Sequence, residues 1–188
     1  MAAGRTNFLR QFWSETKMVG SMFPSSGFLA KLILRNIDFH RARVIVELGP
    51  GTGVFTRRIL EKMHPEARLL VFELNESFYN NLQQEIDDQR VILIHDSAEH
   101  IHDYLLKNDF LHADYIVSSL PISNFPDKLK RNIVDACYKA LRNSGKFIQF
   151  QYSLKCRNLF EEKFQEVTID HTLFNLPPAY VYSCIKIK

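Results

Sequence analysis

The stretch VELGPGTG, at residues 46–53, limits the possible folds of this chain more than any other stretch. It overlaps the β-branched run RVIVEL (43–48) and precedes VFTRRILEKM (54–63), whose apolar residues recur at helical spacing. A strand, a glycine-rich loop and a helix are therefore expected in this order. Glycines permit a tight turn with positive φ, and they let a ligand approach the main chain because no Cβ intervenes. The loop is thus either a tight turn alone or the binding site of a cofactor.

Alternating strand and helix patterns continue along the chain. Further strands are expected at residues 68–74, 90–96, 113–120 and 146–154, and helices at 27–36, 77–86, 127–141 and around Ile101 and Leu105. Residues 164–174 and 179–188 have the pattern of a closing antiparallel pair. This order predicts an α/β fold, in which a mostly parallel sheet carries helices on both faces and binds ligands at the carboxyl ends of its strands.

Length, charge and cysteine content restrict the class of protein. We expect one domain at residues 27–188, preceded at residues 1–26 by an N-terminal amphipathic helix and cofactor lid. No apolar run approaches the ~18 residues of a transmembrane helix, and the N-terminus lacks the features of a secretory signal. Three widely spaced cysteines favour reduced thiols in a cytoplasmic protein. The net charge of +3 permits a membrane surface or RNA as partner, although a nucleic-acid-binding domain is usually more basic.

Acidic residues close two of the expected strands. Glu73 closes the second strand, and Asp96, followed by Ser97 and Ala98, closes the third. An acidic side chain at the end of the second strand can accept hydrogen bonds from both hydroxyls of a ribose. The spacing G-P-G-T-G differs from the dinucleotide pattern G-x-G-x-x-G, and no Lys-Ser/Thr follows it to hold a triphosphate. The pattern therefore favours an adenosine without phosphates, the alternative being that both carboxylates are solvated strand ends.

The stretch VELGPGTGVFTRRIL resembles the first motif of class I S-adenosylmethionine-dependent methyltransferases. Residues 12–34, SSLPISNFP (118–126), GKFIQFQYS (145–153) and FNLPPAYVYSCI (174–185) are similar to the small bacterial phospholipid N-methyltransferases. Those enzymes methylate the amine of phosphatidylethanolamine or related aminolipids, and their core is similar to that of the rRNA adenine dimethylases. The resemblance covers nearly the whole chain and implies a Rossmann-like, mostly parallel seven-stranded sheet with an antiparallel C-terminal strand. One departure is Ser119, where the family usually has glycine.

The resemblance also implies roles for individual residues. Glu47 and the loop at 49–53 hold the methionine part of S-adenosylmethionine, Glu73 holds its ribose, and Asp96 holds its adenine amine. Residues 22–26 close over the cofactor, although Ser26 is equally suited to cap the following helix. The complete cofactor set is Ser25, Glu47, Gly49, Pro50, Gly51, Thr52, Gly53, Glu73, Leu74, Asp96, Ser97, Ala98 and Ser118. The catalytic set that faces the methyl group is Ser119, Leu120 and Pro121.

The stretch after the fourth strand bears on the methyl acceptor. Many amino-methyltransferases have a polar-Pro-Pro-aromatic loop there, whereas this chain has Ser119, Leu120, Pro121 and Ile122. Without an aromatic after Pro121, stacking of a planar base is not expected, and a slender ethanolamine head needs no stacking partner. Main-chain carbonyls near Leu120 are candidates for orienting the amine. Three aromatic residues either contact the methylated ammonium or pack in the core and at its rim, namely Phe125, Tyr152 and Tyr180.

Two features remain open in the sequence. Phe8, Leu9, Phe12 and Trp13 form an apolar stripe at helical spacing with a basic edge, and this stripe either inserts among lipid headgroups or packs on the domain as a lid. His95, His100 and His102 do not share one helical face, so no metal is expected.

The resulting hypothesis is a cytoplasmic enzyme, peripherally associated with the inner face of the membrane, that methylates an aminolipid. Its partners are then the lipid substrate and an anionic membrane surface, with no nucleic acid and no obligatory protein partner. One alternative is an RNA adenine N-methyltransferase, which shares the core. Another is a non-catalytic domain that binds S-adenosylmethionine without transferring its methyl group.

Overall fold

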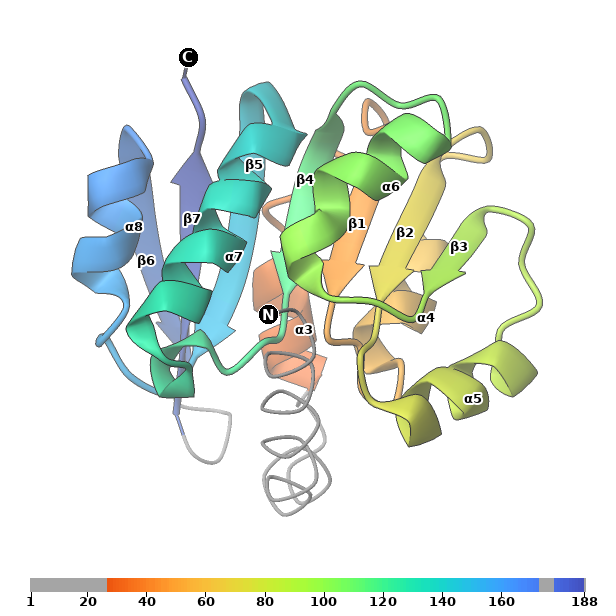
Figure 1. Cartoon of the computed structure of the whole chain (residues 1–188), viewed down its shortest axis with the longest axis horizontal. Helices are drawn as coiled ribbons and strands as arrows, with labels where there is room; N and C mark the ends of the chain where they lie inside the picture. Colours follow the sequence, from red (N-terminus) through yellow and green to blue (C-terminus); the bar gives the residue numbers. More distant parts are fainter. Residues whose placement is uncertain (1–26, 173–177, 188) are drawn as a thin grey trace.

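A seven-stranded sheet forms the centre of the computed structural model, which describes residues 27–172 and 178–187 (Figure 1). Its strands are β1 (Val44–Leu48), β2 (Arg68–Phe72), β3 (Val91–Ile94), β4 (Ala113–Ser118), β5 (Leu141–Gln151), β6 (Glu166–Thr172) and β7 (Ala179–Ile185). They lie in the order β3-β2-β1-β4-β5-β7-β6. The strands β1 to β5 are parallel, and β7 runs antiparallel between β5 and β6. The predicted mostly parallel sheet with an antiparallel closing pair is confirmed.

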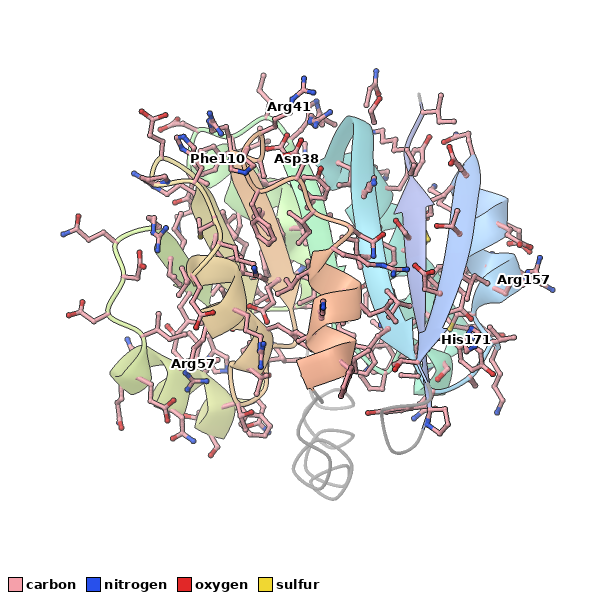
Figure 2. All side chains as sticks on the ribbon, turned by 180° about the vertical axis from the view of Figure 1, so that it is seen from behind. Asp38, Arg41, Arg57, Phe110, Arg157 and His171 are labelled. Carbon is pink, nitrogen blue, oxygen red and sulfur yellow. The ribbon has the colours of Figure 1, made fainter. Side chains whose placement is uncertain are left out.

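Helices cover both faces of the sheet. The face seen in Figure 1 carries α6 (Ile101–Lys107), α7 (Asp127–Ala140) and α8 (Arg157–Lys163). The opposite face carries α3 (Gly27–Leu34) and α4 (Val54–Leu60), which lie in front in the reversed view of Figure 2. After β2 comes α5 (Glu76–Glu85), and the short 3-10 helices η1 (Ala98–His100) and η2 (Ile122–Asn124) precede α6 and α7. None of the described helices is long and apolar enough to cross a membrane.

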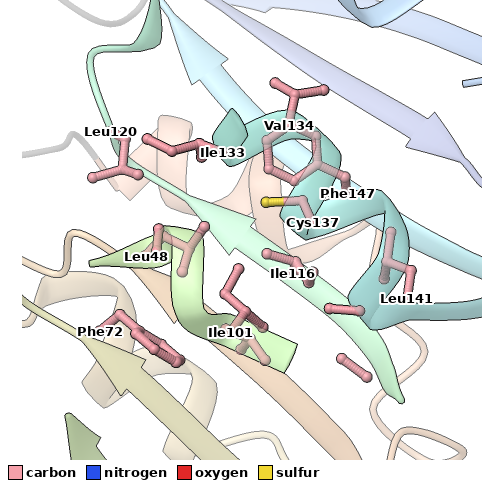
Figure 3. Packing of buried hydrophobic residues seen from close by; sticks show 14 of the residues in the cluster. Leu48, Phe72, Ile101, Ile116, Leu120, Ile133, Val134, Cys137, Leu141 and Phe147 are labelled. Atoms are coloured by element: carbon pink, nitrogen blue, oxygen red, sulfur yellow. The ribbon is translucent and has the colours of Figure 1, made fainter. Parts of the chain in front are cut away.

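The two faces of the sheet bury separate apolar clusters, because side chains alternate along each strand. On β4, Ile116 belongs to the cluster under α6 and α7 that Figure 3 shows, whereas Tyr115 and Val117 belong to the cluster on the α3 and α4 side. All five residues of β1 are buried, as is typical of an interior parallel strand. A polar side chain in such a strand is removed from water, so it requires a partner within the protein or a ligand.

The strand order reverses between β1 and β4. From β1 the chain proceeds outward to β2 and β3, and it then returns to β4 and β5 on the other side of β1. Open α/β sheets bind ligands in the crevice outside the carboxyl ends of the strands at such a point. The glycine-rich loop follows β1 and the stretch at residues 118–126 follows β4. The topology therefore brings the two stretches that stand out in the sequence to one edge of the sheet.

Two elements differ from the expectation. β5 begins at Leu141, five residues before the expected start at residue 146, because Leu141 pairs with Ala113 in β4. The turn signal at residues 143–145 lies within this strand, where Ser144 has a φ of 61° and the register with β4 shifts. α8 was not expected, because its seven residues bury only Phe160 and so show no apolar period.

Candidate active site

The loop after β1 is a tight turn in which three glycines have positive φ, with values of 68° at Gly49, 57° at Gly51 and 76° at Gly53. A Cβ at Gly49 would lie 2.8 Å from Leu120 Cδ2, and a Cβ at Gly53 would lie 2.7 Å from Leu82 Cδ2. In the described part of the chain, no atom lies within 4 Å of the same position at Gly51. Turn geometry therefore accounts for the glycines, while the open space at Gly51 also allows a ligand to approach the main chain.

Glu73 follows β2 and ties its end to the glycine loop. The residue is 1% exposed. Its Oε2 accepts a hydrogen bond from the Gly51 N–H at 3.1 Å, and its Oε1 accepts one from the Asn75 N–H at 2.8 Å. Burial raises the pKa of Glu73 to about 7, although these N–H donors favour the ionised form. A carboxylate has about four acceptor positions, so capacity remains for the hydroxyls of a ribose.

Glu47 lies inside β1 and is fully buried. Among the described residues neither of its carboxylate oxygens finds a hydrogen-bond partner, and the Thr56 hydroxyl is likewise unpaired. Burial raises the pKa of Glu47 to about 7, and the negative charge of Glu73 adds to this rise. The nearby hydroxyl and N–H of Thr56 oppose part of it, although neither forms a hydrogen bond of normal geometry with the carboxylate. A buried carboxylate without a donor is costly. This orphaned group therefore fits a ligand that brings a cation or an N–H donor, as the amino-acid end of S-adenosylmethionine does.

Asp96 follows β3 and is held by three donors. Its Oδ1 accepts from the Ser97 N–H at 2.6 Å and from Nδ1 of His100 at 3.1 Å, and its Oδ2 accepts from the Tyr104 hydroxyl at 3.1 Å. Burial acts to raise the pKa of Asp96, but the donors outweigh burial and hold that pKa below its usual range. Asp96 therefore stays ionised at neutral pH, with acceptor capacity left for an exocyclic amine such as that of adenine.

A hollow opens at this edge of the sheet. Its lining residues are Leu48, Gly49, Phe72, Glu73, Leu74, Asp96, Ser97, Ala98, Leu120, Phe125 and Ile133. Of the residues predicted from the sequence to hold the cofactor, the structure brings Gly49, Glu73, Leu74, Asp96, Ser97 and Ala98 together around this hollow. The apolar Leu48, Phe72 and Ile133, labelled with Leu120 in Figure 3, were not expected, because their pattern is that of ordinary core residues. We call this lined space the strand-end hollow.

Other expected residues lie around the hollow and do not line it. The Pro50 carbonyl accepts from the Gly53 N–H at 3.0 Å, and the Thr52 carbonyl accepts from Arg57 Nη1 at 2.7 Å. These residues shape the turn. Ser25 lies outside the described residues. Within the described ranges, no three His, Cys, Asp or Glu side chains form a group that could hold a metal ion.

Residues 118–126, here called the acceptor loop, leave β4 beside the glycine loop. The Ser119 N–H donates to the Leu48 carbonyl at 2.9 Å and so extends the pairing of β4 with β1. The Ser118 hydroxyl accepts from the Leu120 N–H at 3.3 Å. The Ser119 hydroxyl is buried and has no hydrogen-bond partner in the described part of the chain.

The main-chain carbonyl of Leu120 is already occupied. It accepts from the Ile122 N–H at 2.8 Å, from Gln149 Nε2 at 3.0 Å and from Gln151 Nε2 at 2.9 Å. A carbonyl oxygen has two lone pairs, so three donors leave none for a substrate. In this structure the Leu120 carbonyl is therefore not free to orient an amine, contrary to the expectation from the sequence. The same three hydrogen bonds hold the peptide group that joins Leu120 to Pro121.

Comparisons with known proteins identify the family of the chain. The chain matches the ribosomal RNA adenine dimethylase family over residues 13–153. It is 32% identical over 183 residues to an ornithine lipid N-methyltransferase of Singulisphaera acidiphila, and the match covers 96% of this chain and 95% of that protein. It is 30% identical over 95 residues to the ribosomal RNA small subunit methyltransferase A of Clostridium acetobutylicum, covering 50% of this chain and 31% of that protein.

Solved structures show the same architecture. The N-methyltransferase NodS from Bradyrhizobium japonicum, in complex with S-adenosyl-L-homocysteine, has a TM-score of 0.66 at 13% identity, over 89% of this chain and 90% of its own. An rRNA methylase from Streptococcus thermophilus has a TM-score of 0.62 at 14% identity, over 86% and 95%. At these identities the likeness concerns the Rossmann-like methyltransferase fold alone. The family match and the full-length relative go further: the chain belongs to the ribosomal RNA adenine dimethylase family and is an S-adenosylmethionine-dependent methyltransferase.

Proposed function

We propose that this enzyme transfers the methyl group of S-adenosylmethionine to the amine of an aminolipid headgroup. The extent of the matches supports the proposal. The relative named for a lipid aligns along almost the whole of both chains, whereas the relative named for ribosomal RNA aligns with half of this chain and about a third of its own. The finer choice of phosphatidylethanolamine as the lipid follows from the sequence resemblance.

The observation that carries the proposal is the burial of Ile122. This residue occupies the position where base-methylating relatives have an aromatic, and its exposed fraction is 0%. It packs in the core cluster under α6 and α7. A planar base therefore has no aromatic side chain to stack on at this position. An aliphatic amine on a headgroup needs only to be aligned with the methyl group, which places fewer demands on the loop.

The residues of the site serve alignment and the exclusion of water. When bound, S-adenosylmethionine supplies a methyl group for in-line displacement by a neutral amine. Glu73 and Asp96 would hold its ribose and adenine, and Glu47 would hold its amino-acid end. An amine with a pKa of ~10.4 is mostly protonated at pH 7, which costs roughly 4 to 5 kcal/mol. An apolar pocket around the acceptor amine would reduce this cost by disfavouring the cation.

Peripheral association with an anionic membrane is part of the proposal. A groove of about 430 Å³ between α3 and α4 is lined by Lys31, Leu34, Arg35, Phe39, Arg58 and Lys62. Arg35 pairs with Asp170 at 2.7 Å, and the other three cations make no ion pair within residues 27–172 and 178–187. Cations without counter-ions attract the phosphates of anionic headgroups. The groove supports our proposal that the enzyme associates peripherally with the inner face of the cytoplasmic membrane.

A labelled-methyl assay tests the function. The enzyme is incubated with radiolabelled S-adenosylmethionine and either total lipid vesicles or total RNA. We expect label in an aminolipid, with a rate that rises from pH 7 to 9 as the amine loses its proton, and no label in RNA. Methylated adenine in RNA with an unlabelled lipid fraction would replace the proposal with an RNA adenine N-methyltransferase. Cofactor binding without transfer to either extract would identify a non-catalytic domain.

A further inference from the structure

Two glutamines of β5 are buried in the core beside the acceptor loop. Gln149 is 0% exposed and Gln151 is 4% exposed. Because they are two residues apart in a strand, their side chains leave the same face of the sheet. Both donate through Nε2 to one atom, the Leu120 carbonyl oxygen, at 3.0 and 2.9 Å. The third donor to this oxygen is the Ile122 N–H.

These two side-chain amides hold the segment that follows β4 against β5. The main-chain pairing of β4 with β5 ends where Ser118 lies opposite Gln149. Leu120 is two residues further along, where β4 has ended and the chain turns into η2. Side-chain donors replace the missing main-chain pairing at this point. The Leu120 peptide is therefore anchored to the sheet although it lies outside a strand.

The side chain of Leu120 lies against the glycine loop at residues 49–53. An ideal Cβ at Gly49 would lie 2.8 Å from Leu120 Cδ2, so the leucine side chain fills the space next to this glycine. Leu120 thus links three parts of the site: β5 through its carbonyl, the glycine loop through its side chain, and the acceptor loop through its backbone. A shift of the Leu120 peptide would change the separation between the loop that would hold the methyl donor and the loop that would hold the acceptor.

We propose that Gln149 and Gln151 are positioning residues that set this separation for methyl transfer. The inference rests on the proposed placement of the acceptor loop opposite the methyl group, but not on the identity of the acceptor. A purely stabilising role fits the structure less well. The Gln149 Oε1 atom is buried with no hydrogen-bond partner in the described part of the chain, so this amide bears a desolvation cost that an apolar side chain of the same size would avoid.

The test replaces each glutamine with methionine, which has a similar length and no amide. Gln149→Met and Gln151→Met are made singly and together. The matched control is Gln165→Met, because Gln165 also donates through Nε2, to the Tyr138 hydroxyl at 3.0 Å, and it is exposed. Turnover is measured at saturating cofactor and acceptor, and cofactor affinity is measured by calorimetry. Thermal unfolding shows which variants are folded.

We expect the double variant to lose at least tenfold in kcat, while its cofactor Kd stays within twofold of the wild-type value. The single variants should lose less, because Ile122 and the other glutamine still hold the carbonyl, and Gln165→Met should change neither quantity. A folded double variant with wild-type kcat would overturn the proposal. A loss of cofactor affinity in proportion to kcat would also overturn it, since the glutamines would then act on the cofactor site.

A second measurement does not depend on turnover. The ¹³C shift of the labelled Leu120 carbonyl reports its hydrogen bonds, and we expect it to change in Gln151→Met but not in Gln165→Met. An unchanged shift would show that the anchor is absent in solution. If the wild type methylates RNA and not lipid, the proposed function fails, and the kcat comparison is made with RNA. The two proposals therefore fail separately.

Discussion

At the scale of single residues, the site holds two acidic groups in surroundings that oppose their charge. Burial raises the pKa of Glu47 and of Glu73 from the ordinary 4.5 to about 7. Between pH 4.5 and about pH 7, the folded protein therefore retains protons that the unfolded chain has released. The sign follows from linkage: this contribution to stability is fully present below pH 4.5 and is lost as the pH rises through about 7. At 1.36 kcal/mol per pKa unit, the loss is on the order of 3 kcal/mol for each group.

Glu47→Gln should remove its share of this pH dependence. The neutral amide keeps the size of the side chain and does not ionise, so the free energy of unfolding should fall less between pH 5 and pH 8 than in the wild type. Urea unfolding of the cofactor-free protein at several pH values measures this difference. Equal pH slopes for the wild type and the variant would contradict the assigned pKa of Glu47.

Glu73→Ala should weaken binding of S-adenosylmethionine by about 1.5 to 3 kcal/mol, the range for hydrogen bonds to a charged group. The variant should stay folded, although the Gly51 and Asn75 N–H groups lose their acceptor. Calorimetric titration measures the affinity, with Glu76→Ala as control, since Glu76 is an exposed carboxylate in the first turn of α5. An unchanged affinity in Glu73→Ala would remove Glu73 from the ribose site.

At the scale of elements, Pro121 lies between the anchored Leu120 peptide and the short helix η2. Proline restricts φ, so it limits the conformations that the acceptor loop can adopt. Pro121→Ala should therefore reduce kcat more than cofactor affinity, because the loop would touch the acceptor and not the adenosine. Steady-state kinetics and calorimetry on the same preparation check this. A parallel loss of both quantities would show that Pro121 also supports the cofactor site.

The parallel direction of the strands could be predicted from the sequence, because the first four β-branched runs are each followed by a helical pattern. The position of the Glu73 and Asp96 carboxylates at one edge of the sheet could also be predicted, because the carboxyl ends of parallel strands lie at the same edge. The start of β5 at Leu141 was missed because it depends on a pairing with Ala113. Tyr104, Gln149 and Gln151 were missed because their roles are side-chain hydrogen bonds, to Asp96 for the tyrosine and to the remote Leu120 for the glutamines, and such bonds leave no periodic signal.

At the scale of the whole molecule, the proposed function requires a surface that contacts lipid headgroups. The apolar stripe of Phe8, Leu9, Phe12 and Trp13 lies outside the described residues, so its role stays a prediction from the sequence. If the stripe inserts among headgroups, Phe12→Glu with Trp13→Glu should abolish co-sedimentation with anionic liposomes and leave cofactor affinity intact. A loss of cofactor affinity with unchanged sedimentation would instead identify the stripe as a lid.

The groove between α3 and α4 makes a separate electrostatic prediction. Two of its cations are Arg58 in α4 and Lys62 shortly after the end of that helix, and both line the groove, so reversing both charges changes one positive surface. At about 1 kcal/mol for each basic residue near an anionic membrane, Arg58→Glu with Lys62→Glu should weaken vesicle binding at least roughly thirtyfold.

The control is Lys128→Glu with Lys139→Glu, which makes the same change in net charge on α7, across the sheet from the groove. The effect should shrink in high salt, because ions screen exposed charges beyond the Debye length. Apolar insertion by the N-terminal stripe should be far less sensitive to salt. If both pairs weaken vesicle binding equally, net charge alone attracts the protein, and the groove is not the surface that meets the headgroups.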